Sequence, residues 1–90
     1  MLIARKYLIK GRVQGVFFRT TAALKAEELG ISGSAVNLPN GDVQIIASGE
    51  EESMQAFFEW LHEGPRQASV TSVSCETYAG ELPQGFTIRY

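Results

Sequence analysis

The amino-acid sequence predicts an α+β fold, a two-layer α/β sandwich in which one sheet carries two helices on one face. The length of 90 residues suits one domain, and 44% of the residues are hydrophobic, which is enough for a modest core. Two segments place apolar residues at helical spacing, and they alternate with short segments rich in residues that favour strands. We therefore expect residues 1–90 to form a single domain with the order βαββαβ and a terminal strand.

A first strand and a first helix are expected near the start of the chain. Residues 6–13 are rich in residue types that favour a strand. Gly30 favours the end of the helix that follows, because glycine readily adopts the backbone conformation found just after helix C-termini. The apolar side chains that share one face of this helix are Phe18, Ala22, Ala26 and Leu29.

A hairpin is expected next, with strands over residues 32–38 and 42–48 joined by a Pro-Asn-Gly turn. A three-residue loop would place Asn37 opposite Val43, on the face of the sheet that meets the core. A two-residue loop would place Asn37 opposite Gln44, on the outer face. The proline and the final glycine of the turn favour the three-residue loop. We therefore expect Asn37 at the end of the core face.

A second helix and two further strands complete the predicted fold. Residues 50–52 are all glutamate, which the helix dipole favours in a first turn. The apolar face of this helix consists of Met54, Phe57, Phe58 and Leu61. Strands are expected over residues 69–78 and 86–90, and Val70 and Val73 point to opposite faces of the sheet unless a β-bulge lies between them. The order is that of a ferredoxin-like fold with an antiparallel sheet and both helices on one face.

Composition and charge exclude several classes of function. Eight basic and ten acidic residues give a net charge of -2, so no positive field is present to hold a nucleic acid. No apolar run approaches membrane-spanning length, and Arg5 brings charge too early for a signal peptide, so we expect no membrane contact and a cytoplasmic location. The single Cys75 and the single His62 make neither a disulfide nor a metal site. No metal and no cofactor are expected, and Cys75 is expected to be a buried, small apolar side chain.

The segment from Gly11 to Arg19 links the first strand directly to the first helix. Gly11 and Gly15 allow successive backbone N–H groups to converge, and the helix N-terminus adds partial positive charge. Arg19 supplies a planar fork that matches two phosphate oxygens. The spacing differs from the Walker and Rossmann motifs, so the segment indicates an anion site and not a nucleotide site. The plainer alternative is a tight connection with Arg19 on the solvated surface.

Asn37 is the second candidate residue. In the predicted topology the turn after Asn37 lies at the same end of the sheet as the 11–19 loop, which brings Asn37 near Arg19. An asparagine amide donates and accepts hydrogen bonds, so it can orient a water molecule without taking its proton. When a carboxylate leaves phosphorus, hydrolysis needs mainly a held phosphoryl group and an aligned water. The alternative is that Asn37 satisfies polar groups of the neighbouring turn.

Two segments resemble the signatures of the acylphosphatase family. Residues 9–19 resemble the first signature, Gly-x-Val-Gln-Gly-Val-x-Phe-Arg, and match it completely. Residues 33–43, continuing to Gly49, resemble the second signature, which is built around an asparagine. Ser34 stands where the family usually has an aromatic residue, and Val36 stands where it usually has a basic or long polar one. The resemblance covers nearly the whole chain and leaves both candidate residues in place.

The resemblance implies an enzyme that hydrolyses small acyl phosphates to a carboxylate and inorganic phosphate, without a metal, a cofactor or a covalent intermediate. Arg19 would hold the phosphoryl oxygens and Asn37 the attacking water. The backbone N–H groups that would complete the phosphate loop belong to Arg12, Val13, Gln14, Gly15, Val16, Phe17 and Phe18. The expected partners are the acyl phosphate and inorganic phosphate, which is both product and competing ligand, and the chain is expected to be a monomer. The alternative is a non-catalytic phosphate-binding or regulatory module of the same ferredoxin-like fold.

Overall fold

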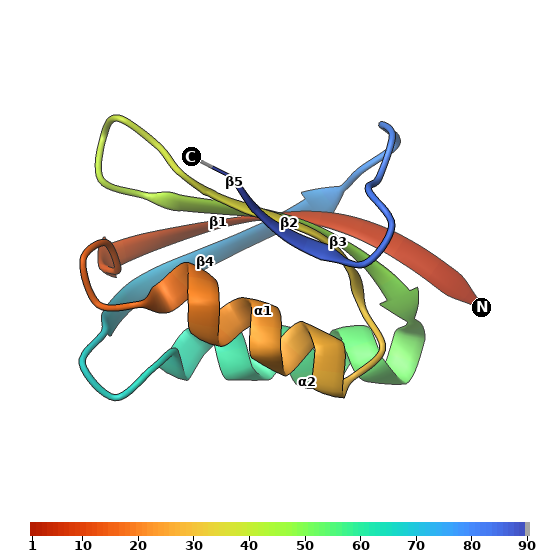
Figure 1. The fold of residues 1–90 in the computed structure, drawn as a ribbon, viewed down its shortest axis with the longest axis horizontal. Coiled ribbons are helices and arrows are strands. Elements are labelled where there is room, and N and C mark those ends of the chain that lie inside the picture. Colours follow the sequence, from red (N-terminus) through yellow and green to blue (C-terminus); the bar gives the residue numbers. More distant parts are fainter. Residues whose placement is uncertain (90) are drawn as a thin grey trace.

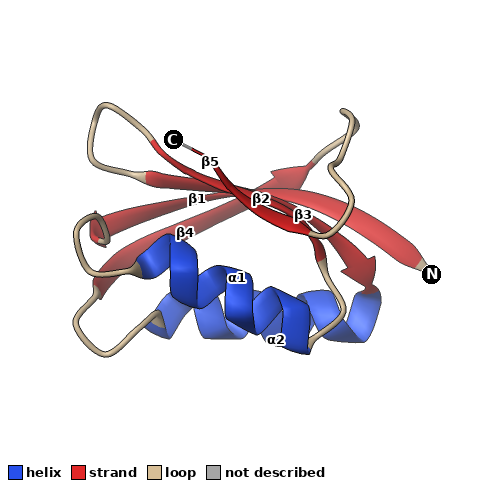
Figure 2. Cartoon of the chain, in the orientation of Figure 1, coloured by secondary structure: helices blue, strands red, loops and turns tan. Residues whose placement is uncertain are grey.

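The computed structural model describes residues 1–89 as a five-stranded sheet with both helices on one of its faces (Figures 1 and 2). The elements in chain order are β1 (Leu2–Arg12), α1 (Phe18–Glu28), β2 (Ser32–Asn37), β3 (Val43–Glu50), α2 (Glu51–Glu63), β4 (Ser69–Thr77) and β5 (Phe86–Arg89). The predicted two-layer sandwich is confirmed, and every predicted helix and strand is present. The prediction for the closing strand also included Tyr90, which lies outside the described residues.

The sheet is mixed, whereas the sequence analysis expected an antiparallel one. Its strand order is β4-β1-β3-β2-β5, and each neighbouring pair among the first four strands in this order is antiparallel. The last strand, β5, pairs in parallel with β2. The reason is topological: β4 and β5 occupy opposite edges of the sheet, and the chain reverses between them before it reaches the free edge of β2. Local sequence patterns do not reveal which edge a last strand joins.

The hairpin between β2 and β3 has the predicted three-residue loop. Asn37 lies opposite Val43, and the backbone N–H of Leu38 donates to the carbonyl of Asp42 at 2.8 Å. Because side chains alternate along a strand, Asn37 shares the core-facing side of β2 with Ala35. This register brings the Asn37 side chain to the end of the sheet where β1 leads into α1.

A β-bulge explains how Val70 and Val73 both pack against the core from β4. The pairing of β1 with β4 shifts between Lys10 and Gly11, and one residue of β4 is left over there. Both valines are partly buried against the core cluster. Gly11 has a φ of 124°, and a Cβ atom on it would lie 2.2 Å from the carbonyl oxygen of Ser69. Glycine is therefore required at this close approach of two backbones.

The core fills the space between the sheet and the two helices. It contains side chains from the inner face of the central strands and from one face of each helix. Its largest fully buried members are Tyr7, Phe18, Phe57, Ile9, Ile45, Met54, Leu61, Val13 and Val43. Cys75, which was predicted to be buried, is instead exposed. This prediction is wrong because β4 is an edge strand, a position that a strand pattern does not show.

Candidate active site

The two candidate residues, Arg19 and Asn37, line one hollow at the end of the sheet where β1 leads into α1. The 13–17 loop and the turn between β2 and β3 lie at this same end (Figure 1). The hollow has a volume of about 200 Å³. Its other lining residues are Val13, Gly15, Phe17, Phe18 and Thr20. We call it the loop pocket. The predicted proximity of Arg19 and Asn37 is thus confirmed.

The loop that forms one wall of the loop pocket takes backbone conformations that few residues adopt. Gly15 has a φ of 76°, and Phe17 has a φ of 61°, in the left-handed region that a residue with a side chain occupies only at a cost. These conformations turn the chain sharply from β1 into α1. Phe17 is 76% exposed, so it projects from the loop into solvent at the rim of the pocket.

The N-terminus of α1 opens into the loop pocket. The first helical hydrogen bond runs from the N–H of Thr21 to the carbonyl of Phe17 at 3.0 Å, so the N–H groups of residues 18–20 precede it. Within the described chain no side chain caps this helix, and its first turn holds no acidic residue. Among residues 1–89, no capping side chain and no acidic residue of the first turn therefore offsets the partial positive charge of the helix end, and this charge favours an anion.

Arg19 lies in the first turn of α1 and is half-buried. Its Nη1 donates a hydrogen bond of 2.6 Å to the carbonyl oxygen of Arg89 at the end of β5. This bond joins the guanidinium to the closing strand of the sheet and fixes its place beside the loop pocket. Arg19 is therefore partly buried and hydrogen-bonded, whereas the plainer alternative placed it on the solvated surface.

Asn37 is half-buried at the end of β2, and its amide makes no hydrogen bond within residues 1–89. The alternative role, satisfying the neighbouring turn, is filled by other residues. Asn40 accepts from the backbone N–H of Asp42 at 3.0 Å and donates to its carboxylate at 3.2 Å. The donor and acceptor atoms of the Asn37 amide are therefore available at the loop pocket.

Gln14 connects the loop to the hairpin turn. Its Nε2 donates to the carbonyl oxygens of Leu38 and Asp42, at 2.8 and 2.9 Å. The Gln14 side chain thus leaves the loop pocket and crosses to the strand end that carries Asn37. Sequence reasoning placed Gln14 in the phosphate loop and missed this role, because nothing local to the residue shows which turn it reaches.

Asp42 anchors the turn from inside. Only 7% of this residue is exposed, and its carboxylate accepts from Lys10 Nζ at 2.9 Å. Lys10 lies near the end of β1, so the ion pair joins the turn to the central strand. The sequence shows an acidic residue directly after the Pro-Asn-Gly turn, which could have marked Asp42 as an anchor. Its burial could not be predicted, because it depends on the pairing of β1 with β3.

The predicted phosphate-loop residues divide into two groups. The side of the loop that faces the pocket consists of Val13, Gly15, Phe17 and Phe18. The other three are Arg12, which is exposed at the end of β1, Gln14, and Val16, which is buried in the core. Thr20 lines the pocket without having been predicted. The feature of the sequence that could have predicted this is that Thr20 directly follows Arg19, in the first turn of the helix.

Comparison with known proteins identifies the family. The sequence model of the acylphosphatase family matches residues 5–88. A protein named acylphosphatase from Alkalilimnicola ehrlichii is 42% identical over 85 residues, which cover 94% of this chain and 96% of the relative. The chain belongs to the acylphosphatase family. The solved acylphosphatases agree in fold: one from Coxiella burnetii is 42% identical with a TM-score of 0.93 and covers 98% of this chain and 93% of that one.

A second solved acylphosphatase, from Bacillus subtilis, is 33% identical with a TM-score of 0.92, and the two chains cover each other fully. The predicted family, ferredoxin-like fold and enzyme class, acylphosphatase, are confirmed by these comparisons. No helix among residues 1–89 is long and apolar enough to cross a membrane. In the same residues, no three His, Cys, Asp or Glu side chains gather as they would to hold a metal ion.

The two departures from the acylphosphatase signature lie away from the loop pocket. Ser34 and Val36 precede Asn37 by an odd number of residues, so their side chains leave β2 on the opposite face. Ser34 is 7% exposed and lines a different hollow, together with Ile46. The departures therefore flank Asn37 in the sequence but do not line the loop pocket with it.

Proposed function

We propose that this chain hydrolyses the carboxyl–phosphate bond of small acyl phosphates in the loop pocket. The observation that carries the proposal is that Arg19, Asn37 and the uncapped N-terminus of α1 border one hollow. The products are a carboxylate and inorganic phosphate, and the reaction is a direct attack of water without a covalent intermediate. The acylphosphatase family supports the reaction class.

The phosphoryl group is held by the backbone N–H groups of residues 12–18 and by Arg19. Converging N–H groups and a helix N-terminus favour an anion, and the guanidinium adds charge-assisted hydrogen bonds to two phosphoryl oxygens. The same groups stabilise the negative charge on those oxygens in the transition state. Gly15 and Phe17 hold the left-handed backbone conformations that turn the loop around the pocket.

Asn37 positions the attacking water. The water donates one hydrogen bond to the amide oxygen of Asn37, which leaves a lone pair directed at phosphorus. A bond forms between the water oxygen and phosphorus, while the bond from phosphorus to the acyl oxygen breaks and its electron pair stays on the carboxylate. The water proton passes to the phosphate product or to solvent. A strong general base is unnecessary because the carboxylate is a good leaving group.

The test is hydrolysis of benzoyl phosphate in the presence of a metal chelator, with inorganic phosphate as a competitor. Arg19→Ala is expected to lower kcat/KM by about 1,000-fold and to abolish inhibition by phosphate. Asn37→Ala is expected to lower kcat by about 100-fold while phosphate still binds. Equal loss of phosphate binding in both variants would contradict the assigned roles.

The same assay separates the enzyme from the alternative. A protein that binds inorganic phosphate but leaves benzoyl phosphate intact would be a non-catalytic phosphate-binding or regulatory module. The proposal also includes a monomer of one domain over residues 1–90 that acts in the cytoplasm without a metal or cofactor. Size-exclusion chromatography coupled to light scattering checks the monomer, and activity that survives the chelator checks metal independence.

A further inference from the structure

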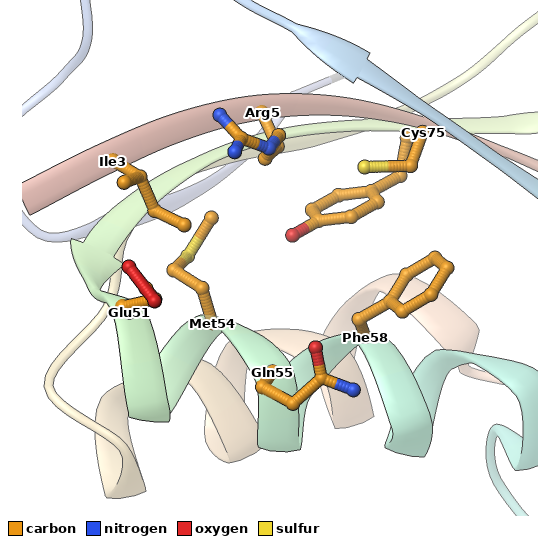
Figure 3. A pocket seen from close by; sticks show the side chains of 8 residues that line it. Ile3, Arg5, Glu51, Met54, Gln55, Phe58 and Cys75 are labelled. Carbon is orange, nitrogen blue, oxygen red and sulfur yellow. The ribbon is translucent and has the colours of Figure 1, made fainter.

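A second hollow lies at the other end of β1, between the sheet and α2 (Figure 3). Its volume is about 380 Å³, within the range of small-molecule sites. Figure 3 shows Ile3 and Arg5 reaching it from β1, and Met54 and Phe58 rising toward it from α2. We call it the helix pocket. It shares no lining residue with the loop pocket.

Tyr7 brings an unpaired hydroxyl to the helix pocket. Tyr7 is 1% exposed, and its ring packs against Phe57 and Phe58 with ring centroids 6.1 and 5.8 Å away. Its hydroxyl makes no hydrogen bond within residues 1–89. In that part of the chain every fully enclosed side-chain nitrogen or oxygen has a partner, so the Tyr7 oxygen keeps its accessible surface in the hollow that Tyr7 lines. A phenolic hydroxyl at the surface of a hollow can donate a hydrogen bond to a ligand there.

Arg5 brings a positive charge to the same hollow. Side chains alternate along β1, so Arg5 shares the helix-covered face of the strand with Ile3 and Tyr7. It is half-buried, and its Nη1 donates only to the carbonyl of its neighbour Ala4, at 3.0 Å. Among the described residues no carboxylate pairs with it, although Glu51 also lines the hollow. A guanidinium in this setting favours an anion.

We propose that the helix pocket binds a small organic monocarboxylate. Its carboxylate accepts hydrogen bonds from the guanidinium of Arg5 and the hydroxyl of Tyr7, and its apolar body packs against Met54 and Phe58. One cation and one hydroxyl match the single charge of a carboxylate. The carboxylate of Glu51 at the same hollow repels a doubly charged anion such as phosphate, so the ligand differs in class from the anion of the loop pocket.

The test titrates the whole protein with phenylacetate and follows the backbone amide signals by NMR. Inorganic phosphate is kept at saturation, so that binding in the loop pocket is suppressed. Phenylacetate is expected to shift the signals of residues that line the helix pocket. The neutral analogue phenylacetamide is expected to bind about tenfold more weakly, because the charge-assisted hydrogen bond is lost.

Variants assign the binding to the two polar side chains. Arg5→Gln is expected to raise the Kd for phenylacetate about tenfold, and Tyr7→Phe about threefold. Lys6→Gln is the matched control: Lys6 is the next residue on β1, on the opposite face, and pairs with Glu76 at 3.7 Å. It is expected to leave the Kd unchanged.

A conservative variant distinguishes a loss of binding from a loss of the folded structure. Arg5→Lys keeps the charge but not the planar fork, and it is expected to raise the Kd less than Arg5→Gln does. The proposal is overturned if phenylacetate shifts only residues 13–20, or if its Kd is the same in wild type and Arg5→Gln. Because these readouts measure binding at the helix pocket, they are independent of hydrolysis in the loop pocket.

Discussion

The pockets at the two ends of β1 are built from different parts of the chain. At the C-terminal end of β1, the loop pocket is bounded by a sharply turning backbone, with Gly15 and Phe17 in left-handed conformations and the N-terminus of α1 at its edge. At its N-terminal end, the helix pocket is built from side chains that alternate along a regular strand. A backbone site depends on how the loop is held, whereas a side-chain site depends on what covers it. The two ends should therefore respond differently to substitution.

The supports of the two sites differ accordingly. The loop is held by hydrogen bonds from Gln14 to the hairpin turn, and the turn is held by the ion pair of Asp42 with Lys10. The helix pocket is held by packing, because the ring of Tyr7 lies between β1 and the aromatic side chains of α2. Polar variants should thus disturb the first site and apolar truncations the second.

The largest effect is expected from Gln14→Leu, which cuts the link between the loop and the turn. The leucine fills similar space but cannot donate to the carbonyls of Leu38 and Asp42. We expect kcat/KM for benzoyl phosphate to fall about 100-fold, since a displacement of about 1 Å in a positioned group has that effect. Gln44→Leu, on the outer face of β3, is the control and should keep full activity. Unchanged kinetics in Gln14→Leu would mean that the loop holds its shape alone.

A smaller effect is expected from Asp42→Ala, which removes the buried half of an ion pair. The side chain of Asp42 is 11% exposed and that of its partner Lys10 51%. We expect the free energy of unfolding to fall by about 2 kcal/mol in urea titrations. Glu76→Ala breaks the pair with Lys6, whose side chains are 68% and 38% exposed, and it should cost less than about 0.5 kcal/mol. If Asp42→Ala and Glu76→Ala lose the same free energy of unfolding, the ion pair of Asp42 with Lys10 does not hold the turn, and the turn does not support the loop pocket.

The third prediction concerns pH and the other end of β1. Burial, with the nearby Cys75 acting in the same direction, raises the pKa of Tyr7 to about 12. The folded state thus favours the neutral hydroxyl, so this stabilisation is complete below about pH 10 and is lost as pH rises toward 12. At about pH 11 the wild type should have lost about 1.4 kcal/mol more stability than Tyr7→Phe. The control Tyr78→Phe should retain the wild-type pH dependence; if Tyr7→Phe retains it too, the assignment to Tyr7 fails.

The contrast between the two ends also explains what the sequence could predict. Glycine spacing and Arg19 indicate the loop pocket, and the Pro-Asn-Gly turn sets the register that delivers Asn37, because these are local effects. The helix pocket was not foreseen, since Arg5 becomes a binding candidate only once α2 is known to cover its face of β1. The exposure of Cys75 and the parallel pairing of β5 depend in the same way on which strand forms an edge.

The smallest effect is expected from Phe17→Gly, which tests the strain in the loop. A φ of 61° costs a residue with a side chain about 1–2 kcal/mol, and glycine loses about 0.5–1 kcal/mol through greater freedom in the unfolded chain. Because Phe17 is 76% exposed, its replacement by glycine removes little buried surface. The variant should therefore gain about 0.5 kcal/mol in urea titrations. Phe17→Ala, which keeps the strain, should show no gain; if it gains as much as Phe17→Gly, the exposed ring and not the backbone is the source. A gain confined to Phe17→Gly would show that the loop pocket holds its shape against the local preference of the chain.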